Sequence, residues 1–488
     1  MGSDPSLLIR DLGRALKERN RAQVNAAIRG LIRLGPPLGA KWKTLAAASK
    51  HNGELGDAWA AMMLYARDVG DTPQVRYELA AISSQMGFVD RAAAIMDGLA
   101  DDVPDPASNA YIKGTIWTNL GDFAKARSQL HRAVAANPGS GQAWLALAMA
   151  GPISEDDSRA LEAASSRMES SPDLERAAYS YALGKLFHER GQYAEAFEAF
   201  RRGADAVRKE RPYNAARDRE SAANAMAGWT PEAVRKINER LRGGGRNPPI
   251  FVTGLPRSGT TLVEQILVSH SAVSAGDELG LFRHLEQDAG GKSVPDIDRY
   301  QLRGGSMHEL ATLYFHLLDE RFPGAERVVD KTLNSSRYIG LIMALFPEAP
   351  VVWLRRDPLD CAWSAYRTWF LRGLNWSWSL RDIAHHFNLE DALFEHWTAM
   401  FPDRILAVDY SQLVSDPRGQ VERITAHCQL EFEAQQLESH LTTRTVTTAS
   451  VTQVRNPINR LALDSSRPYR EWLTPFVEDY SRGPESVS

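Results

Sequence analysis

A glycine turn between an apolar run and an apolar helix carries the first chemical signal of this sequence. The turn spans residues 254–261, GLPRSGTT, and follows the apolar residues 250–252. A strand, a glycine turn and a helix start direct backbone amides at one point, and such a point binds anions without a metal ion. The glycine spacing is that of a nucleoside triphosphate loop, but Thr260 stands where that loop has its lysine. We therefore predict a site for an anionic nucleotide, in which Arg257 supplies positive charge.

Two more cationic positions follow apolar runs later in the chain. Lys331 comes shortly after residues 327–329, and Arg356 comes shortly after residues 351–354. Because ligands of parallel sheets bind beyond the carboxyl ends of the strands, both side chains are expected near the glycine turn. Ser364 follows Arg356 by eight residues on a predicted helix, so that a guanidinium and a hydroxyl could bind one phosphate together.

A sheet must position these residues, and the second half of the chain has the pattern of one. Short β-rich runs alternate there with helical stretches. The runs are 250–253, 327–329, 351–354 and 405–408, and the helices are 260–269, 305–321, 335–346 and 358–371. This alternation predicts an α/β domain with a mostly parallel sheet that helices cover on both faces.

The first half of the chain is helical by pattern and repeats itself. Gly87, Ala92, Leu99 and Pro104 are followed 34 residues later by Gly121, Ala126, Ala133 and Pro138. A third good unit surrounds Gly191. This spacing resembles the tetratricopeptide repeat over approximately residues 39–210. The resemblance implies an α-helical solenoid of stacked helix pairs, which is a binding surface rather than a catalyst.

Composition excludes several classes of protein. At 488 residues the chain is long enough for two or three domains. A net charge of -4 gives no basic surface for nucleic acid. Two cysteines are too few for a disulfide framework, and no stretch has the apolar length of a signal peptide or a membrane span. A cytoplasmic protein without a membrane span is expected.

Two of the motifs together resemble the sulfotransferases. Residues 252–262 are similar to the 5'-phosphosulfate loop of that family, and residues 354–358 with Ser364 are similar to its 3'-phosphate motif. The resemblance covers about residues 248–475. Within the family the chain resembles the protein-tyrosine sulfotransferase branch, through residues 275–278, 330–331 and 408–413.

The resemblance implies transfer of a sulfuryl group from 3'-phosphoadenosine 5'-phosphosulfate (PAPS) to an acceptor hydroxyl, with the tyrosine of a protein or peptide as one candidate. It implies that Lys331 stabilises the bridging oxygen and that Glu278 accepts the acceptor proton. The 5'-phosphosulfate would lie on Arg257, Ser258, Gly259, Thr260 and Thr261, and the 3'-phosphate on Arg356 and Ser364. Ser450 and Arg455 belong to a segment that is similar to one closing over the nucleotide, and are further donor contacts.

No metal ion is expected, because a sulfuryl group carries less negative charge than a phosphoryl group and fixed Arg, Lys and amide donors can stabilise its transfer. Asp277 is an alternative to Glu278 as the base. Gly280 stands where the tyrosylprotein enzymes have an arginine, so a sugar or a lipid stays open as the acceptor. Two other readings stay open: a P-loop kinase or ATPase with residues 328–330 on the magnesium side, and a repeat scaffold with an inactive transferase domain.

The predicted organisation is thus a helical cap over residues 1–38, tetratricopeptide-like repeats over 39–235, a linker over 236–249 and a sulfotransferase domain over 250–488. The linker is predicted from its Gly- and Pro-rich composition. We expect the repeat region to engage the acceptor, which would be a protein, a peptide or a small molecule.

Overall fold

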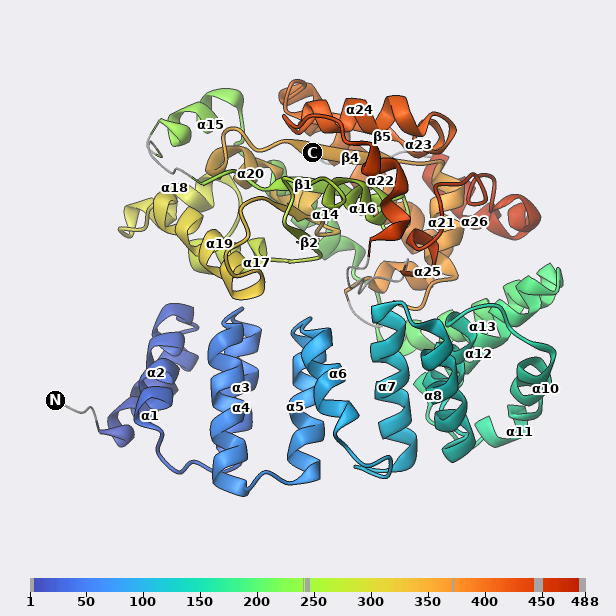
Figure 1. Ribbon diagram of the computed structural model, residues 1–488. Helices are drawn as coiled ribbons and strands as arrows, with labels where there is room; N and C mark the ends of the chain where they lie inside the picture. The colour runs from blue at the N-terminus through green and yellow to red at the C-terminus, as the bar shows by residue number, and fades with distance from the viewer. Residues whose placement is uncertain (1–3, 240, 242–245, 371–372, 443–450, 482–488) are drawn as a thin grey trace.

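The computed structural model describes residues 4–239, 241, 246–370, 373–442 and 451–481. An N-terminal region of paired helices is followed by an α/β domain, which confirms the predicted fold class. In Figure 1 the helix pairs stand side by side along one side of the α/β domain.

The helix-pair region, defined here as residues 5–210, consists of short helices joined by tight turns. Local signals set its helix ends: Asp122 caps one helix by accepting from the Lys125 amide, and Gly121 ends the preceding one at a φ of +85°. The helices are α1 (Pro5–Lys17), α2 (Arg21–Leu34), α3 (Lys41–His51), α4 (Leu55–Val69), α5 (Pro73–Gln85), α6 (Val89–Asp97), α7 (Pro106–Leu120), α8 (Phe123–Ala136), α9 (Gly141–Met149), α10 (Glu155–Ala163), α11 (Ser165–Met168), α12 (Asp173–Glu189) and α13 (Tyr193–Glu210).

Two connecting helices, α14 (Ala215–Met226) and α15 (Pro231–Asn238), pack into the core of the α/β domain. Trp229, between them, is buried and donates its indole N–H to the carbonyl of Lys292 at 3.1 Å. The sequence pattern places residues up to 235 with the repeats, and that boundary stays a prediction. An Ala-rich amphipathic helix does not reveal in its sequence which core it covers, and Ala222 and Ala225 of α14 pack in the core of the α/β domain.

The sheet has five parallel strands in the order β2-β3-β1-β4-β5. Its strands are β1 (Ile250–Gly254), β2 (Ala275–Asp277), β3 (Val328–Asp330), β4 (Val351–Arg355) and β5 (Ile405–Asp409). Four of the five correspond to the predicted runs. The edge strand β2 was missed because its three residues, Ala-Gly-Asp, have low β propensity.

Helices cover both faces of the sheet. Ile250 and Val252 of β1 enter one core with α16 (Thr260–Val268), while Phe251 between them enters the other. The remaining elements are α17 (Phe282–Ala289), α18 (Val294–Leu302), α19 (Met307–Arg321), η1 (Ser335–Tyr338), α20 (Ile339–Leu345), α21 (Pro358–Tyr366), η2 (Asn375–Trp378), α22 (Leu380–Met400), α23 (Tyr410–Ser415), α24 (Pro417–His427), η3 (Ala434–Leu441), α25 (Val451–Val454), η4 (Arg467–Leu473) and α26 (Thr474–Ser481).

The helix-pair region and the α/β domain share one hydrophobic core. Tyr181 and Phe200 of the helix pairs pack in the same cluster as Trp363 and Trp378 of the α/β domain. The hydroxyl of Tyr181 donates to the carbonyl oxygen of Tyr366 at 2.9 Å, and both residues are buried. The two parts are therefore joined by packing as well as by the chain. Among the described residues, no helix has the length and apolar character needed to cross a bilayer.

Candidate functional site

The glycine turn lies at the carboxyl end of β1, where α16 begins. Gly254 and Gly259 have φ angles of +142° and +108°, in the region that favours glycine. A Cβ atom at Gly259 would lie 2.6 Å from Tyr410, so the turn also requires glycine for space. The N-cap residue of α16 is Gly259, which has no side chain to cap the first turn. Its N-terminal N–H groups and its dipole therefore face the space in front of the turn.

Arg257 is held in an unusual conformation within this turn. Its φ is +71°, which is rare for a residue with a side chain. Its guanidinium donates to Ser364 Oγ at 3.0 Å and to Gln453 Oε1 at 2.8 Å. Burial, together with the charges of Arg367 and Arg356, lowers the pKa of Arg257 to about 10. Three guanidinium groups thus converge on one place, which is favourable once an anion with several charges lies between them.

Arg356 comes directly after β4 and lines the cavity beside the glycine turn. Its side chain is 7% exposed and lies over the ring of Tyr410, 5.0 Å from the centroid. It donates to the carbonyl oxygens of Arg257, at 2.9 Å, and of Ala462, while its buried Nε has no hydrogen-bond partner in the part of the chain that the structure describes. A buried N–H without an acceptor is costly, so this nitrogen fits a site that receives an oxygen ligand.

A lysine lies between two carboxylates at the ends of β2 and β3. Lys331 follows β3, and its side chain has no exposed surface. Its Nζ lies 2.5 Å from Glu278 Oε1 and 3.8 Å from Glu264 Oε2. Glu264 belongs to α16 and is fully buried, whereas the Glu278 side chain is 37% exposed. Glu278 thus lies on the solvent side of the lysine, and Glu264 lies on its buried side.

Asp330 lies in β3 next to Lys331, but its carboxylate belongs to a different group of contacts. It accepts from Thr332 Oγ1 at 2.6 Å and from the hydroxyl of Tyr314 at 2.9 Å. Burial raises the pKa of Asp330 to about 6, against the lowering effect of these two donors. The side chain does not line the cavity in front of the glycine turn, as a magnesium-side carboxylate would have to.

A cavity of about 1320 Å³ lies in front of the glycine turn and extends to Glu278. Arg257, Thr260, Thr261 and Arg356 line one part of it, and Glu278 lines another. The volume is above the range of about 300–1,000 Å³ that single small-molecule sites occupy. The cavity can therefore hold a nucleotide together with part of a second molecule.

The wall opposite the glycine turn comes from the connecting helix α14 and from α22. Arg337 lies 3.0 Å from both Asp218 and Glu390, and His386 Nδ1 lies 2.7 Å from Asp218. The hydroxyl of Tyr213 donates to Asp218 at 2.6 Å. Although burial opposes it, the contacts with His386 and Arg337 hold the pKa of Asp218 well below its usual range. This wall is polar, and Tyr213 and Asp218 contribute to it from outside the predicted catalytic domain.

The structure brings most of the predicted site residues together, with differences in their roles. Ser364 is buried and accepts from Arg257, so it positions that arginine rather than lining the cavity. Lys331 likewise lies beneath Glu278 and does not line the cavity. Arg455 donates to the carbonyl oxygen of Thr442 and is not a lining residue. Ser450 lies outside the described residues.

Several lining residues were not predicted. Arg367 lines the cavity and follows Ser364 by three residues on one helix face, a spacing that could have identified it. It contacts His188 of the helix-pair region, at 3.1 Å from Nη1 to Nε2. Burial and the charge of Arg367 lower the pKa of His188 to about 4. No pattern in the sequence connects His188 with this arginine, because the contact joins residues 179 positions apart.

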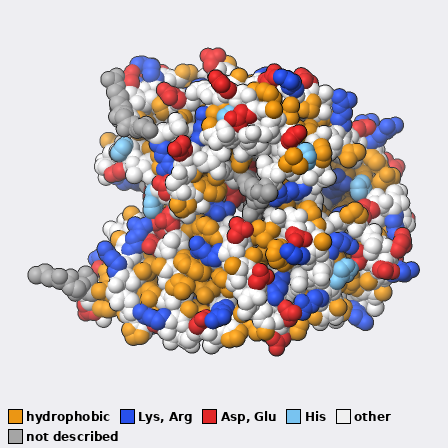
Figure 2. Space-filling view, in the orientation of Figure 1, with side chains coloured by type: hydrophobic (Ala, Val, Ile, Leu, Met, Phe, Trp, Pro, Cys, Tyr) orange, Lys and Arg blue, Asp and Glu red, His pale blue; other side chains and the backbone are white. Residues whose placement is uncertain are grey.

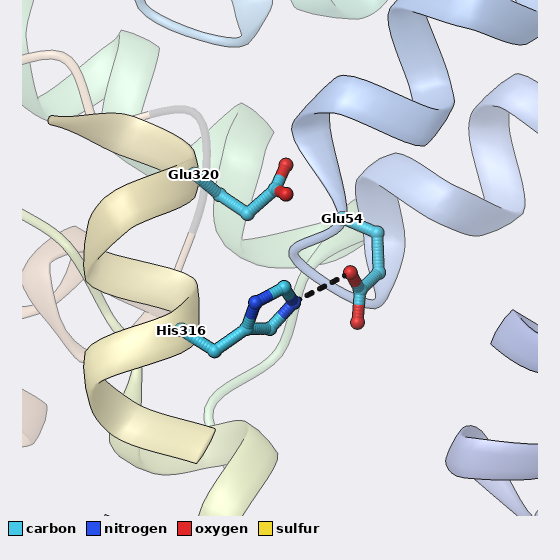
Figure 3. Close-up of side chains that lie close together, drawn as sticks. All are labelled: Glu54, His316 and Glu320. Atoms are coloured by element: carbon cyan, nitrogen blue, oxygen red, sulfur yellow. Dashed lines mark hydrogen bonds and ion pairs between the residues drawn. The ribbon is translucent and has the colours of Figure 1, made fainter. Parts of the chain in front are cut away.

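A second charged cluster lies between the two parts of the chain, away from the cavity. Figure 3 shows Glu54, His316 and Glu320 facing one another, with His316 Nε2 2.8 Å from Glu54 Oε2. Glu54 is also paired with Arg21, at 3.3 Å, and with Arg29. Because two guanidinium groups already neutralise the buried carboxylate, the cluster is an ion-pair network rather than a metal site.

The fold and the cavity define an α/β protein with a cationic glycine turn and a buried lysine–carboxylate group at the carboxyl edge of a parallel sheet. Residues 248–434 match the sulfotransferase family. The C-terminal half of the chain therefore contains a domain of the sulfotransferase family.

Individual relatives differ in how much of the chain they cover. An uncharacterized protein of Aquifex aeolicus is 34% identical over 330 residues, which are 64% of this chain and 42% of that protein. The chain thus spans less than half of that relative's length. Protein-tyrosine sulfotransferase A of Caenorhabditis elegans is 25% identical over 258 residues, 50% of this chain and 65% of that protein. The sulfotransferase domain of the Synechococcus PCC 7002 olefin synthase is 20% identical, with a TM-score of 0.35 and coverage of 46% of this chain and 90% of that domain.

Proposed function

We propose that this protein transfers a sulfuryl group from PAPS to an acceptor hydroxyl. One observation carries the proposal: the cationic glycine turn and the carboxylate of Glu278 line the same cavity, with the ammonium group of Lys331 directly behind that carboxylate. An anion site, a proton acceptor and a buried cation at one edge of a sheet are what an anionic group transfer requires.

The residues of the cavity fit the donor. The buried Nε of Arg356 and the buried Oγ of Ser258 have no hydrogen-bond partner among the described residues. The N-terminal turn of α16, with Arg257, would hold the 5'-phosphosulfate. Arg356 and Arg367 would hold the 3'-phosphate, with Ser364 positioning Arg257 from behind.

The reaction follows from this arrangement. The acceptor oxygen attacks the sulfur while the bond from sulfur to the bridging oxygen of the 5'-phosphate breaks. The acceptor proton passes to Glu278, and the products are the sulfated acceptor and 3'-phosphoadenosine 5'-phosphate (PAP). Protonation of Glu278 removes the negative partner of Lys331 at 2.5 Å, so that the ammonium charge becomes available to the bridging oxygen. Glu264, at 3.8 Å, keeps the buried ammonium compensated throughout.

We propose a tyrosine in a protein or peptide as the acceptor. The likeness to the Caenorhabditis elegans protein-tyrosine sulfotransferase supports this choice. The size of the cavity and the half-buried aromatic residues Trp369 and Phe370 on its wall are compatible with an aromatic side chain. We also propose that the helix pairs are tetratricopeptide-type repeats, on the evidence of the 34-residue spacing of their turn glycines.

Radiolabelled PAPS incubated with a tyrosine-containing peptide, a saccharide, a lipid and a cell extract tests the proposal and identifies the acceptor. Glu278→Gln should lower transfer by about a hundred- to ten-thousand-fold while its affinity for PAP stays unchanged. Arg356→Ala should instead weaken PAP binding by about 10- to 100-fold, through the loss of charge-assisted hydrogen bonds. Both affinities are measured by calorimetry.

The same calorimetry separates this function from phosphoryl transfer. Tight binding of ATP and magnesium together with no response to PAP would refute the sulfotransferase and favour a kinase or ATPase. Transfer that survives in Glu278→Gln at the wild-type rate would refute Glu278 as the base, and Asp277→Asn would then be tested in its place.

A further inference from the structure

Successive turns of the helix-pair region carry glycines at a fixed interval. Gly53, Gly87 and Gly121 are 34 residues apart and join α3 to α4, α5 to α6 and α7 to α8. Their φ angles are +84°, +84° and +85°, so each turn has the same left-handed backbone. In Figure 1 the helix pairs that carry them stand along one side of the α/β domain.

Each of these three turns touches the α/β domain or its C-terminal segment. A Cβ atom added at any of them would lie between 2.5 and 3.2 Å from a side chain of that domain. The nearest partners are Leu317 for Gly53, Arg321 for Gly87 and Arg455 for Gly121. The corresponding turn between α12 and α13 is different, because Gly191, at a φ of +73°, has no atom within 4 Å of the same position.

The middle turn holds an arginine that leads to the site. A Cβ atom at Gly87 would lie 2.5 Å from Arg321 Nη2, so the guanidinium rests directly on this glycine. The guanidinium carbon of Arg321 also lies 5.5 Å from the ring centroid of Phe88. Arg91 contacts the same ring, 4.6 Å from its centroid. The α5–α6 turn is therefore shaped to fix the position of Arg321.

Arg321 connects this turn to Asp277, the last residue of β2, which directly precedes Glu278. Its Nη2 donates to Asp277 Oδ2 at 2.8 Å, and both side chains are 17% exposed. The second carboxylate oxygen of Asp277, Oδ1, accepts from the Glu278 amide at 2.8 Å. The backbone carbonyl oxygen of Asp277 accepts from the Lys331 amide at 3.0 Å. Although burial opposes it, Arg321 lowers the pKa of Asp277. The Asp277 carboxylate thus links Arg321 to the backbone of Glu278, and the backbone carbonyl of the same residue holds the backbone of Lys331.

The turn between α3 and α4 contacts α19, the helix that carries Arg321. Glu54 contacts His316 (Figure 3). Glu320 accepts from the Gly56 amide at 2.6 Å. Both partners lie on α19, upstream of or next to Arg321. Figure 2 shows acidic and basic side chains along the seam between the two parts of the molecule. The α3–α4 and α5–α6 turns therefore hold the C-terminal half of α19 in place together.

We propose that the α5–α6 turn positions the catalytic carboxylate, through Gly87, Arg321 and Asp277, and that Arg321 is a positioning residue of the transfer reaction. The inference rests on the proposed function of Glu278. It gives the helix pairs a part in catalysis in addition to any binding of the acceptor.

Replacement of Arg321 tests the link kinetically. Arg321→Ala should lower kcat by about 10- to 100-fold with little change in KM for PAPS, because a small displacement of a reacting group affects the chemical step more than donor binding. Arg321→Lys keeps the positive charge beside Asp277 and should restore most of the wild-type kcat, which a role in packing alone would not predict.

Two glycine substitutions provide a matched pair. Gly87→Ala and Gly191→Ala both place a side chain at a left-handed φ, so they share the backbone strain. Only Gly87→Ala also displaces Arg321. The kcat of Gly87→Ala should fall toward that of Arg321→Ala, whereas Gly191→Ala should keep the wild-type kcat. Equal kcat values in the two glycine variants would overturn the proposal.

Hydrogen exchange tests the link without any turnover. The Glu278 amide, which donates to Asp277, should exchange faster in Arg321→Ala and in Gly87→Ala than in the wild type and Gly191→Ala. Faster exchange supports the link even if the wild type transfers no sulfuryl group, in which case the proposed function alone fails. If Arg321→Ala does not fold, Asp277→Asn gives the same readout with a smaller change. Unchanged exchange in the folded variants overturns the proposal.

Discussion

The buried lysine between two carboxylates allows a quantitative prediction about stability. Lys331→Met keeps the length of the side chain but removes its charge, which leaves Glu264 fully buried without its cation at 3.8 Å. At that distance an ion pair is worth about 4 kcal/mol with an effective dielectric constant of about 20. Loss of one partner of a buried pair typically costs about 3–5 kcal/mol, which agrees. Glu278 loses the same cation, but its side chain is 37% exposed, so water solvates its charge and this loss adds little.

The partner substitution should cost less. Glu264→Gln keeps the shape of the side chain, and Lys331 retains Glu278 at 2.5 Å, so we expect a loss of about 1–2 kcal/mol. If the two effects were independent, the double variant would lose about 5–6 kcal/mol, by addition of the single losses. We expect the double variant to lose only about 2–3 kcal/mol, because the uncompensated carboxylate is gone, which gives a coupling of about 3 kcal/mol.

Urea unfolding followed by tryptophan fluorescence measures these values, with equal m values as the condition for comparing midpoints. Additive losses in the double variant would refute the reasoning. They would mean that Glu264 and Lys331 do not share an electrostatic interaction and that Glu264 does not compensate the lysine during transfer.

Two further predictions concern the contact between the two parts of the chain. His284 is 3% exposed, and burial, with Arg283, Arg21 and His51 nearby, lowers its pKa to about 3 against the effect of Glu54. The folded protein keeps this histidine neutral, so its contribution to stability is present above the unfolded pKa of about 6.5 and is lost as the pH falls. His284→Gln should therefore remove about 2 kcal/mol of the decrease in unfolding free energy between pH 7.5 and pH 5. Equal pH dependence of wild type and variant in urea titrations would contradict this. Tyr181→Phe should lower the free energy of unfolding by about 1–2 kcal/mol, because the buried carbonyl of Tyr366 loses its donor. Thermal unfolding measures this loss, and Tyr193→Phe, at an exposed tyrosine, is the control with an expected change near zero.

The shared core changes the meaning of one experiment that the sequence suggests. A truncated protein without the repeats could show whether they select the acceptor only if the α/β domain folds without them. Trp363, Tyr366 and Trp378 would then lose the packing of Tyr181 and Phe200. Point variants at the seam, such as Gly87→Ala, are therefore the better test of what the helix pairs contribute.

Most strands and the glycine turn could be predicted from the sequence without the structure. Strongly apolar β runs and the glycine turn are local signals, since the backbone conformation at Gly254 and Gly259 depends on a few adjacent residues. The fold class and four of the five strands followed from these patterns. The resemblance in two separated motifs then pointed to Arg257, Arg356 and Glu278, which the structure places around one cavity.

The tertiary structure alone decided what lies behind and around those residues. Glu264 reaches Lys331 from a different element, Arg367 meets His188 of the helix pairs, and Arg321 rests on Gly87. These contacts join residues that are distant in the chain, and each side chain, considered alone, has the properties of an ordinary surface charge or turn glycine. Their roles depend on which faces pack together, and that is set by the burial of the whole apolar surface rather than by any local spacing.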